Sequence, residues 1–411
     1  MQGGLKVEIC ILSGARTPFG KFGGSLKDFD YFDLGAIPIR EVLKRVGIEG
    51  KEVDEVVWGV GDTSVCKDVY TPVAARQTLL NAGLPPQTPS LSLDKACVSA
   101  MSAVMLGWRA MRCGDIRMAI GGGATSFSQE PYILRKARFD GFRLGNIQIE
   151  DPLYRLGYKD FNPVATDTGI VALKHDITRD EQDEWALRSH QRYGKAWNEG
   201  KFKEEMIPLE LSQKDRKIKI LDVDEQYRAD VTLERLAKLP TIYESPTVTA
   251  GNAPGLNDGA AAILFSTKAA SDELNVKPLA SILGMVSVAT EPNLLPEAPA
   301  LAIERVLDQT GLSLDEIDII EINEAFAAVP LVSTKILAER YYGGKKNKLQ
   351  QLKDKTNING SAIAIGHPNT ASGARIIMTL CYELKRRRGG LAIGAICGGL
   401  AQADACVLKV T

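Results

Sequence analysis

Residues 391–399 read Leu-Ala-Ile-Gly-Ala-Ile-Cys-Gly-Gly, and this stretch is the strongest indication of the fold class. A short apolar run that ends in glycines is typical of a buried strand with a turn at its end. A similar stretch, Met-Ala-Ile-Gly-Gly-Gly, occupies residues 118–123. Two predicted strands that are both followed by glycines are weak evidence of an internal repeat. They favour a chain built from two similar halves.

Strands and helices alternate around these two stretches. Besides them, six apolar runs have the length and spacing of strands: 7–12, 53–60, 261–265, 280–288, 317–322 and 405–410. Four segments carry helical spacing: 33–46, 98–112, 299–310 and 372–388. Such alternation predicts an α/β protein whose sheets are covered by helices.

One segment interrupts the alternation. Residues 128–249 are richer in charges, aromatic residues and prolines than the rest of the chain. We interpret them as an inserted loop subdomain. The first half then consists of residues 1–127 and 250–277, and the second half of residues 278–411.

Composition limits the classes of function. A chain of 411 residues that is 45% hydrophobic can bury a large core and by length should form two or three domains. The net charge of −1 gives no reason to expect nucleic acid as a partner. Residues 1–8 lack an apolar signal core, and no run of about eighteen uninterrupted apolar residues occurs. We therefore expect a soluble, cytoplasmic protein that does not associate with membranes.

The seven cysteines are odd in number and lack the spacing of metal ligands. Reduced thiols explain them better than a disulfide framework or a metal site. Cys10 and Cys406 lie in predicted strands, where we expect them to face the core.

Two other cysteines stand in frames of glycine and small residues. Cys97 lies in Asp-Lys-Ala-Cys-Val-Ser-Ala at residues 94–100, and Cys397 precedes two glycines. Cys97 begins a predicted helix, whose dipole would lower the pKa of its thiol. Thioester exchange coupled to carbon–carbon bond chemistry needs one thiolate to carry an acyl group, a base, and a second thiol to move a proton. Taken alone, Cys97 fits an inert core residue better than a nucleophile.

Only three histidines could supply the base. His175 and His190 lie in the charged, amphipathic stretch 174–192, so we expect them on a solvated helix face. His367 differs because an apolar run leads up to Gly366 and Pro368 stops it. His367 is therefore the candidate base. A buried histidine with a purely structural role, whose ring nitrogens are both hydrogen-bonded, would fit the same pattern.

Asn323 follows the predicted strand 317–322 within Asn-Glu-Ala-Phe-Ala at residues 323–327. An amide at a strand end is well placed to hold a water or an oxyanion.

Four segments together resemble the four active-site motifs of the thiolase family, both in their residues and in their order along the chain. They are the segments around Cys97, Asn323, His367 and Cys397. Residues 14–24, 247–252 and 255–261 also resemble thiolase sequence, so the likeness covers nearly the whole chain. It implies a thiolase fold, with two similar halves in a five-layered αβαβα arrangement. It also implies a homodimer or homotetramer and a role in fatty acid metabolism. Acyl-CoA and coenzyme A are the implied substrates, without a prosthetic group or a metal.

The resemblance also implies roles for the motif residues. Cys97 would be the acylated nucleophile and His367 its base. Cys397 would take a proton from, or return one to, the α-carbon of an acyl-CoA. The enolate oxygen would meet His367 and a water held by Asn323. The thioester oxyanion would meet the backbone N–H groups of Cys97 and Gly399, each worth roughly 3 kcal/mol of barrier.

Seven further residues fall at positions where the family contacts coenzyme A or the acyl group. They are Val164, Arg228, Ala250, Gly251, Pro254, Ala325 and Phe326. The insert would cover the coenzyme.

Several positions depart from the family pattern. Pro254 stands in place of a serine that touches pantetheine, and Val164 in place of a methionine. Asn369 and Thr370 replace Ile-Gly, and Leu400 replaces the last of three glycines. We expect a weaker hold on coenzyme A. Because valine is shorter than methionine, we also expect a 3-oxoacyl-CoA bulkier than acetoacetyl-CoA as substrate.

Other readings stay open. A ketoacyl synthase-like condensing enzyme would have a histidine or asparagine where Cys397 stands. A non-catalytic, thiolase-like subunit of a hetero-oligomer would bind acyl-CoA only, and a Cys–His–Asn protease is a third reading. Residues 341–355 have no thiolase counterpart, and we expect a solvated loop there, with a partner-binding role as the minor alternative.

Overall fold

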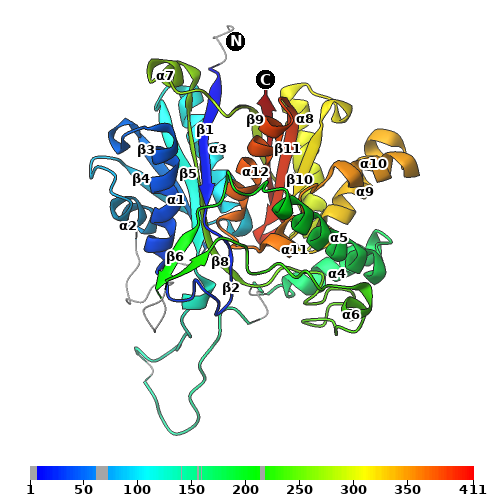
Figure 1. Ribbon diagram of the computed structural model, residues 1–411. Helices are drawn as coiled ribbons and strands as arrows, with labels where there is room; N and C mark the ends of the chain where they lie inside the picture. Colours follow the sequence, from blue (N-terminus) through cyan, green and yellow to red (C-terminus); the bar gives the residue numbers. More distant parts are fainter. Residues whose placement is uncertain (1–6, 62–72, 140, 155–156, 159, 213–217) are drawn as a thin grey trace.

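The computed structural model describes residues 7–61, 73–139, 141–154, 157–158, 160–212 and 218–411 (Figure 1). Cys66 and most of the N-terminal stretch used above to argue against a signal peptide lie outside these ranges. The strands are β1 (Ile9–Arg16), β2 (Gly20–Lys21), β3 (Glu55–Val60), β4 (Ser90–Leu93), β5 (Met118–Thr125), β6 (Leu209–Ser212), β7 (Ile218–Leu221), β8 (Asn257–Thr267), β9 (Ala280–Ala289), β10 (Ile319–Ile322), β11 (Gly390–Gly398) and β12 (Gln402–Val410).

The α-helices are α1 (Tyr31–Val46), α2 (Ala74–Asn81), α3 (Ser99–Cys113), α4 (Val164–Lys174), α5 (Arg179–Asn198), α6 (Leu233–Ala237), α7 (Lys268–Glu273), α8 (Ala298–Thr310), α9 (Ala328–Tyr342), α10 (Lys346–Lys355), α11 (Ala362–Ile365) and α12 (Ser372–Arg386). A short 3₁₀ turn, Ala96–Val98, leads into α3. All eight predicted strands and all four predicted helices are present, with shifted ends.

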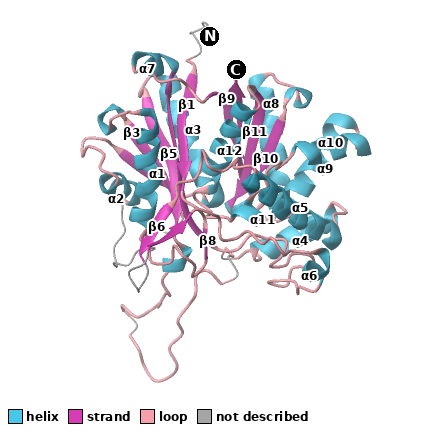
Figure 2. Cartoon of the chain, viewed as in Figure 1, coloured by secondary structure: helices cyan, strands magenta, loops and turns pink. Residues whose placement is uncertain are grey.

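The main sheet has two parts. Its strand order is β10-β11-β12-β9-β1-β8-β5-β3-β4, and β2 pairs with β8. The two parts join where β1 pairs with β9 through only two residue pairs, Cys10 with Ser281 and Ile11 with Ala280. Figure 2 shows the strands of the N-terminal half on one side and those of the C-terminal half on the other. The two-half organisation is therefore visible in the strand pairing.

Three apolar clusters fill the spaces between the layers. One packs α1 and α2 against the strands of the first half. The second surrounds α3 and α12, which lie between the two parts of the sheet. The third packs α8 and α9 against β10, β11 and β12. The order is thus helix, sheet, helix, sheet, helix, as the thiolase resemblance implies. Cys10 and Cys406 are fully buried in these clusters, as expected.

Residues 128–249 contain α4, α5, α6 and the antiparallel strand pair β6–β7, drawn in green in Figure 1. A buried ion cluster fastens this segment to β1. The Nε of Arg16 lies 2.8 Å from a Glu205 carboxylate oxygen, and its Nη1 lies 2.7 Å from Asp224. None of these three side chains is exposed, so removing one partner would leave an uncompensated buried charge.

The expectation of a loop at residues 341–355 is wrong. α9 continues to Tyr342, and α10 occupies Lys346–Lys355. Leu352 is buried, and the Nζ of Lys355 donates to the carbonyls of Leu314 and Ile317 at 2.9 and 2.8 Å. One buried leucine among charged residues gave too weak a period to indicate a helix.

None of the helices in the described part of the chain combines the length and the apolar character needed to cross a membrane. Across the same residues, no group of three or more His, Cys, Asp or Glu side chains is arranged to hold a metal ion.

Candidate active site

A cavity of about 510 Å³ opens where the two halves meet the insert. Four of the five predicted catalytic residues line it, and so do six of the seven predicted coenzyme or acyl contacts. These are Cys97, His367, Cys397 and Gly399, with Val164, Arg228, Ala250, Pro254, Ala325 and Phe326. The volume falls in the range of small-molecule sites. Residues as far apart in the sequence as Cys97 and Gly399 therefore face one space.

The turn that carries Cys97 is held on several sides. Asp94 accepts a hydrogen bond from the backbone N–H of Ala96 at 2.8 Å, and the Nζ of Lys95 lies 2.6 Å from the buried carboxylate of Asp404 on β12. Ala96 has a φ of +49°, a left-handed conformation that is costly for alanine. Such strain persists where the surroundings fix it, and it is common next to reactive residues.

Two glycines allow close packing next to the reactive residues. Gly398 lies against the turn that carries Cys97, and Gly366 lies against Asn257. A Cβ on Gly398 would lie 3.0 Å from the backbone N of Val98 and 3.2 Å from that of Cys97. Gly366 has a φ of +109°, and a Cβ there would press on the side chain of Asn257. The carboxamide of Asn257 accepts the backbone N–H of His367 at 2.9 Å. These contacts fix the two thiols and the imidazole relative to one another.

His367 is oriented by Ser372. Its Nδ1 lies 2.7 Å from the hydroxyl of Ser372, which donates to the carbonyl of Pro368 at 3.0 Å. Because the hydroxyl proton is used there, the oxygen accepts from Nδ1–H. Nε2 is then the acceptor nitrogen, and it lies 3.1 Å from the Sγ of Cys97. The imidazole is therefore in the tautomer that can take the Cys97 proton.

Burial keeps this pair neutral. It raises the pKa of the Cys97 thiol to about 12, with Asp94 adding to the rise. Burial, with a smaller contribution from the nearby Arg375 guanidinium, lowers the pKa of His367 to about 3. The expectation that the helix dipole lowers the pKa of Cys97 is wrong, because loss of solvation outweighs the dipole. The thiol is not ionised in the resting protein, so it must be activated by proton transfer to His367 during the reaction.

Asn323 reaches this pair from the end of β10. The Nη2 of Arg375 lies 3.3 Å from its Oδ1, which turns its Nδ2 toward His367 Nε2, 3.5 Å away. Arg375 is itself paired with the buried carboxylate of Glu321. The amide therefore presents an N–H donor beside the imidazole, where it can hold a water or an enolate oxygen.

Cys397 ends the long buried strand β11, and none of its surface is exposed to bulk solvent. Burial raises the pKa of its thiol, and the nearness of Cys97 raises it further. Cys397 is thus a neutral thiol at neutral pH. A neutral thiol can donate a proton, and it can accept one back after it has given its proton away.

The other two histidines are not on a solvated face, so that expectation is wrong. His190 is only 4% exposed, and its Nδ1 accepts the backbone N–H of Arg228 at 3.3 Å. Burial, with a further contribution from Arg228, lowers the pKa of His190 to about 4. His175 caps the end of α4 and lies 2.9 Å from Glu297. His190 therefore supports the segment that carries Arg228.

Gly251 is not part of the cavity lining. A Cβ at this position would lie 2.5 Å from the side chains of Leu236 and Leu239, so Gly251 packs against α6 and the residues after it. Its backbone N–H donates to the Thr249 hydroxyl at 3.2 Å. It shapes the wall that Ala250 and Pro254 present.

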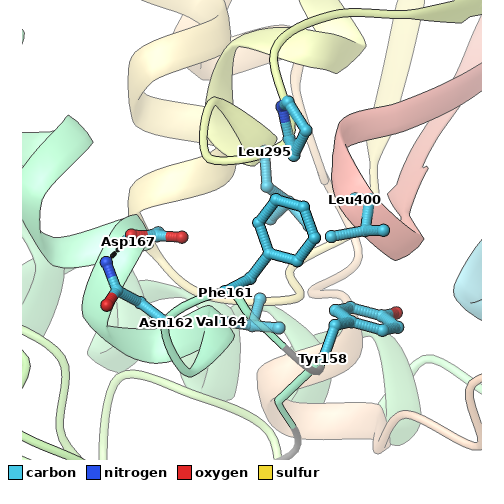
Figure 3. A pocket seen from close by; sticks show the side chains of 8 residues that line it. Tyr158, Phe161, Asn162, Val164, Asp167, Leu295 and Leu400 are labelled. Carbon is cyan, nitrogen blue, oxygen red and sulfur yellow. Dashed lines mark hydrogen bonds between the residues drawn. The ribbon is translucent and has the colours of Figure 1, made fainter.

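Val164 does line the cavity, but the space behind it is filled. A second, small pocket there holds about 10 Å³, room for about one water, among Phe161, Leu295 and Leu400 (Figure 3). The argument that valine leaves room for a bulkier acyl group therefore does not hold on this side.

Sequence reasoning missed Ser372, Asn257 and Asp404, which position the reactive groups. Ser372 lies five residues after His367 and begins α12, so its hydroxyl faces back toward the imidazole. Asn257 is the first residue of β8, which is buried throughout, and Asp404 lies in the buried part of β12 between Ala403 and Ala405. A polar residue in such a strand is the one signal that could have drawn attention to them.

Comparison with known proteins identifies the family of the chain. A model of the thiolase N-terminal domain matches residues 9–269, and a model of the thiolase C-terminal domain matches residues 276–410. The chain belongs to the thiolase family. The family and fold expected from the sequence are therefore confirmed.

Individual relatives cover nearly all of the chain. A probable acetyl-CoA acetyltransferase of Mycolicibacterium smegmatis is 39% identical over 97% of this chain and all of its own length. The human mitochondrial 3-ketoacyl-CoA thiolase is 36% identical over 98% of each chain. A crystal structure of the human enzyme in complex with CoA aligns with a TM-score of 0.90, over 99% of each chain.

Proposed function

We propose that this chain is a thiolase that cleaves a 3-oxoacyl-CoA with coenzyme A, or forms it by Claisen condensation, through an acyl-Cys97 intermediate. The observation that carries the proposal is the contact of 3.1 Å between Cys97 Sγ and the acceptor nitrogen of His367, in one cavity with Cys397. Relatives named acetyl-CoA acetyltransferase and 3-ketoacyl-CoA thiolase support the substrate class.

In the cleaving direction, Cys97 gives its proton to His367 and the thiolate attacks C3 of the substrate. The C2–C3 bond breaks, its electron pair forms an enolate, and Cys397 protonates C2 to release acetyl-CoA. Coenzyme A then attacks the acyl-Cys97 thioester and gives its thiol proton to Cys397. Cys97 leaves and recovers its proton from His367. At the end of the cycle Cys97, His367 and Cys397 are again neutral, in keeping with the pKa values that burial sets.

Oxyanions form at both stages. The backbone N–H groups of Cys97 and Gly399, whose residues both line the cavity, are the proposed donors for the oxyanion of the acyl-transfer steps. The Nδ2 of Asn323, beside His367, is the proposed donor toward a water or the enolate oxygen.

Arg228, Ala250, Pro254, Ala325 and Phe326 lie on the cavity wall, and Arg228 belongs to the insert. We propose that this wall receives the pantetheine arm and that the insert covers the coenzyme. The domain limits given above, a homodimer or homotetramer, a cytoplasmic location and a role in fatty acid metabolism remain proposals. So does the absence of nucleic acid, membrane and metal partners. Light scattering of the purified chain would test the oligomeric state.

The function is tested by mixing the purified chain with acetoacetyl-CoA and coenzyme A. We expect loss of the 3-oxoacyl-CoA and appearance of acetyl-CoA only when both substrates are present. An inert acyl-CoA-binding subunit would bind the ligands without this turnover. A ketoacyl synthase-like enzyme would instead require a decarboxylating substrate.

Replacing the Ser372 hydroxyl should disturb the tautomer of His367. Ser372→Ala removes the acceptor of Nδ1–H, and the loss of about one hydrogen bond should lower kcat/KM for acylation about tenfold. Ser372→Thr keeps the hydroxyl and should retain most of the rate. Stopped-flow measurement of acylation by acetyl-CoA checks both variants. Equal losses in the two would mean that Ser372 acts only through packing.

The neutral thiol–imidazole pair predicts an unusual pH profile. His367 stays unprotonated until the pH falls toward about 3, and Cys97 stays protonated until about 12. The acylation rate should therefore be level between about pH 5 and 9. A fall in rate with a midpoint near the ordinary histidine pKa of about 6.5 would contradict this.

That experiment needs a stability control. Because the pKa values of His190 and His367 are depressed, the unfolded chain binds more protons than the folded one below about pH 6.5. Stability should fall as the pH drops from there toward 4, so circular dichroism at each pH should accompany the rates.

A further inference from the structure

Leu400 and Ala401 follow Gly399 in a conformation that is rare for their residue types. Leu400 has φ +53° and ψ +49°, and Ala401 has φ +57°. The flanking contacts hold this turn in place. The side chain of Gln402 donates to the carbonyl of Gly399 at 3.2 Å, and the backbone N–H of Thr290 donates to the carbonyl of Ala401 at 3.1 Å. Strain that is fixed in this way occurs most often at functional sites.

The left-handed turn directs the Leu400 side chain into the small pocket behind Val164. Figure 3 shows the ring of Phe161 beside Leu400 and Leu295, with Tyr158 on the near side. The remaining volume of about 10 Å³ accepts no more than about one water. Leu400 therefore helps to fill a space that would otherwise extend away from the reactive groups.

This pocket adjoins the active-site cavity. Tyr158, Val164 and Leu295 line both spaces. The hydroxyl of Tyr158 would lie 2.8 Å from a Cβ at Gly399, which places the ring against the proposed oxyanion donor. These residues thus form one wall of the active-site cavity, next to Gly399.

We propose that Leu400 is the specificity-determining residue that limits the length of the acyl group, which makes this chain selective for short 3-oxoacyl-CoA substrates. The inference rests on the proposed thiolase function and names the substrate class of that same site. An acyl group transferred to Cys97 can extend along the wall formed by Val164 and Tyr158 only as far as Leu400. Each methylene that cannot be accommodated should cost roughly tenfold or more in kcat/KM.

Three variants separate side-chain volume from backbone conformation. Leu400→Gly removes the side chain and relieves the left-handed strain. Leu400→Ala removes most of the side chain but keeps the strain, because alanine also disfavours positive φ. Ala401→Gly relieves strain at the neighbouring residue, which is fully buried and lines neither pocket, so it is the matched control.

The experiment measures kcat/KM for acetoacetyl-CoA and for straight-chain 3-oxoacyl-CoA substrates of increasing length. In the unmodified chain, kcat/KM should fall steeply as the chain lengthens. Both Leu400 variants should raise the ratio of long-chain to acetoacetyl-CoA kcat/KM by about tenfold or more, with the KM for coenzyme A unchanged. Ala401→Gly should leave that ratio as it is.

Different failures have different meanings. Turnover of acetoacetyl-CoA with an unchanged chain-length ratio in both Leu400 variants would overturn the role of Leu400 and leave the proposed function intact. A broadened ratio in Ala401→Gly as well would assign the effect to the backbone and also overturn it. Absence of thiolysis in the unmodified chain would contradict the proposed function itself. Should the Leu400 variants fail to fold, acylation of unmodified Cys97 by long-chain acyl-CoA as fast as by acetyl-CoA would overturn the proposal.

Discussion

Cys97→Ser should lower the rate of acyl transfer by more than about a thousandfold. A serine hydroxyl holds its proton far more tightly than a thiol, and the imidazole that would have to take it has a pKa of only about 3. Acylation by acetyl-CoA and thiolysis of acetoacetyl-CoA should therefore both collapse. Steady-state rates of the two reactions provide the measurement.

Cys113→Ser is the matched control for this substitution. Cys113 ends the same helix, α3, but it is exposed and does not line the cavity. It should react and turn over like the unmodified chain. A Cys97→Ser variant that still carried a covalent acyl group on another residue would show that Cys97 has been misassigned.

Cys397→Ala should separate the two half-reactions. Of its two proposed proton transfers, the one at carbon is worth about a hundredfold to ten-thousandfold when a positioned group performs it. The other, with the thiol of coenzyme A, matters less, because a thiolate can leave without a proton donor. Exchange of the α-hydrogens of acetyl-CoA with deuterium should fall by that amount. Acylation of Cys97 should persist, because Cys97 and His367 keep their contact of 3.1 Å.

Cys406→Ala controls for the loss of a buried thiol. Cys406 lies on β12 opposite Gly394 of β11, fully buried, and does not line the cavity. Both half-reactions should survive its loss. Equal decreases of acylation and exchange in Cys397→Ala would rule out separate tasks for the two thiols.

The fold could be predicted because the apolar runs have a clear period. β11 and β5 are buried along most of their length, β11 ends in a glycine, and β5 contains three glycines, so continuous apolar character and small residues both indicated them. α10 and β4 gave no such signal. One is charged with a single buried leucine, and the other is a short edge strand of alternating serine and leucine. Tertiary contacts decide such segments.

The motif residues were also readable from the sequence, since Cys97, His367 and Cys397 are chemically distinctive. Their pKa values could not be predicted from the sequence. The pKa of Cys97 depends on how completely the surrounding segments exclude water, and these come from both halves of the chain and from the insert. His190 illustrates the same limit, because a charged, amphipathic stretch can still bury one polar residue whose partner, Arg228, is distant in sequence.

Leu400 marks a third limit. Its identity departs from the family pattern in plain view, yet its consequence depends on a left-handed backbone and on Phe161, which comes from the insert. Sequence comparison alone suggested that Val164 would leave extra acyl space. The packing of a residue far along the chain removes that space.

Covalent acylation at Cys97 is the central claim, and intact-protein mass spectrometry after incubation with acetyl-CoA tests it most directly. The account predicts the mass increase of a single acetyl group, located on Cys97 by peptide mapping and removed by added coenzyme A. No increase, or a stable acetyl group on any other residue, would contradict the account.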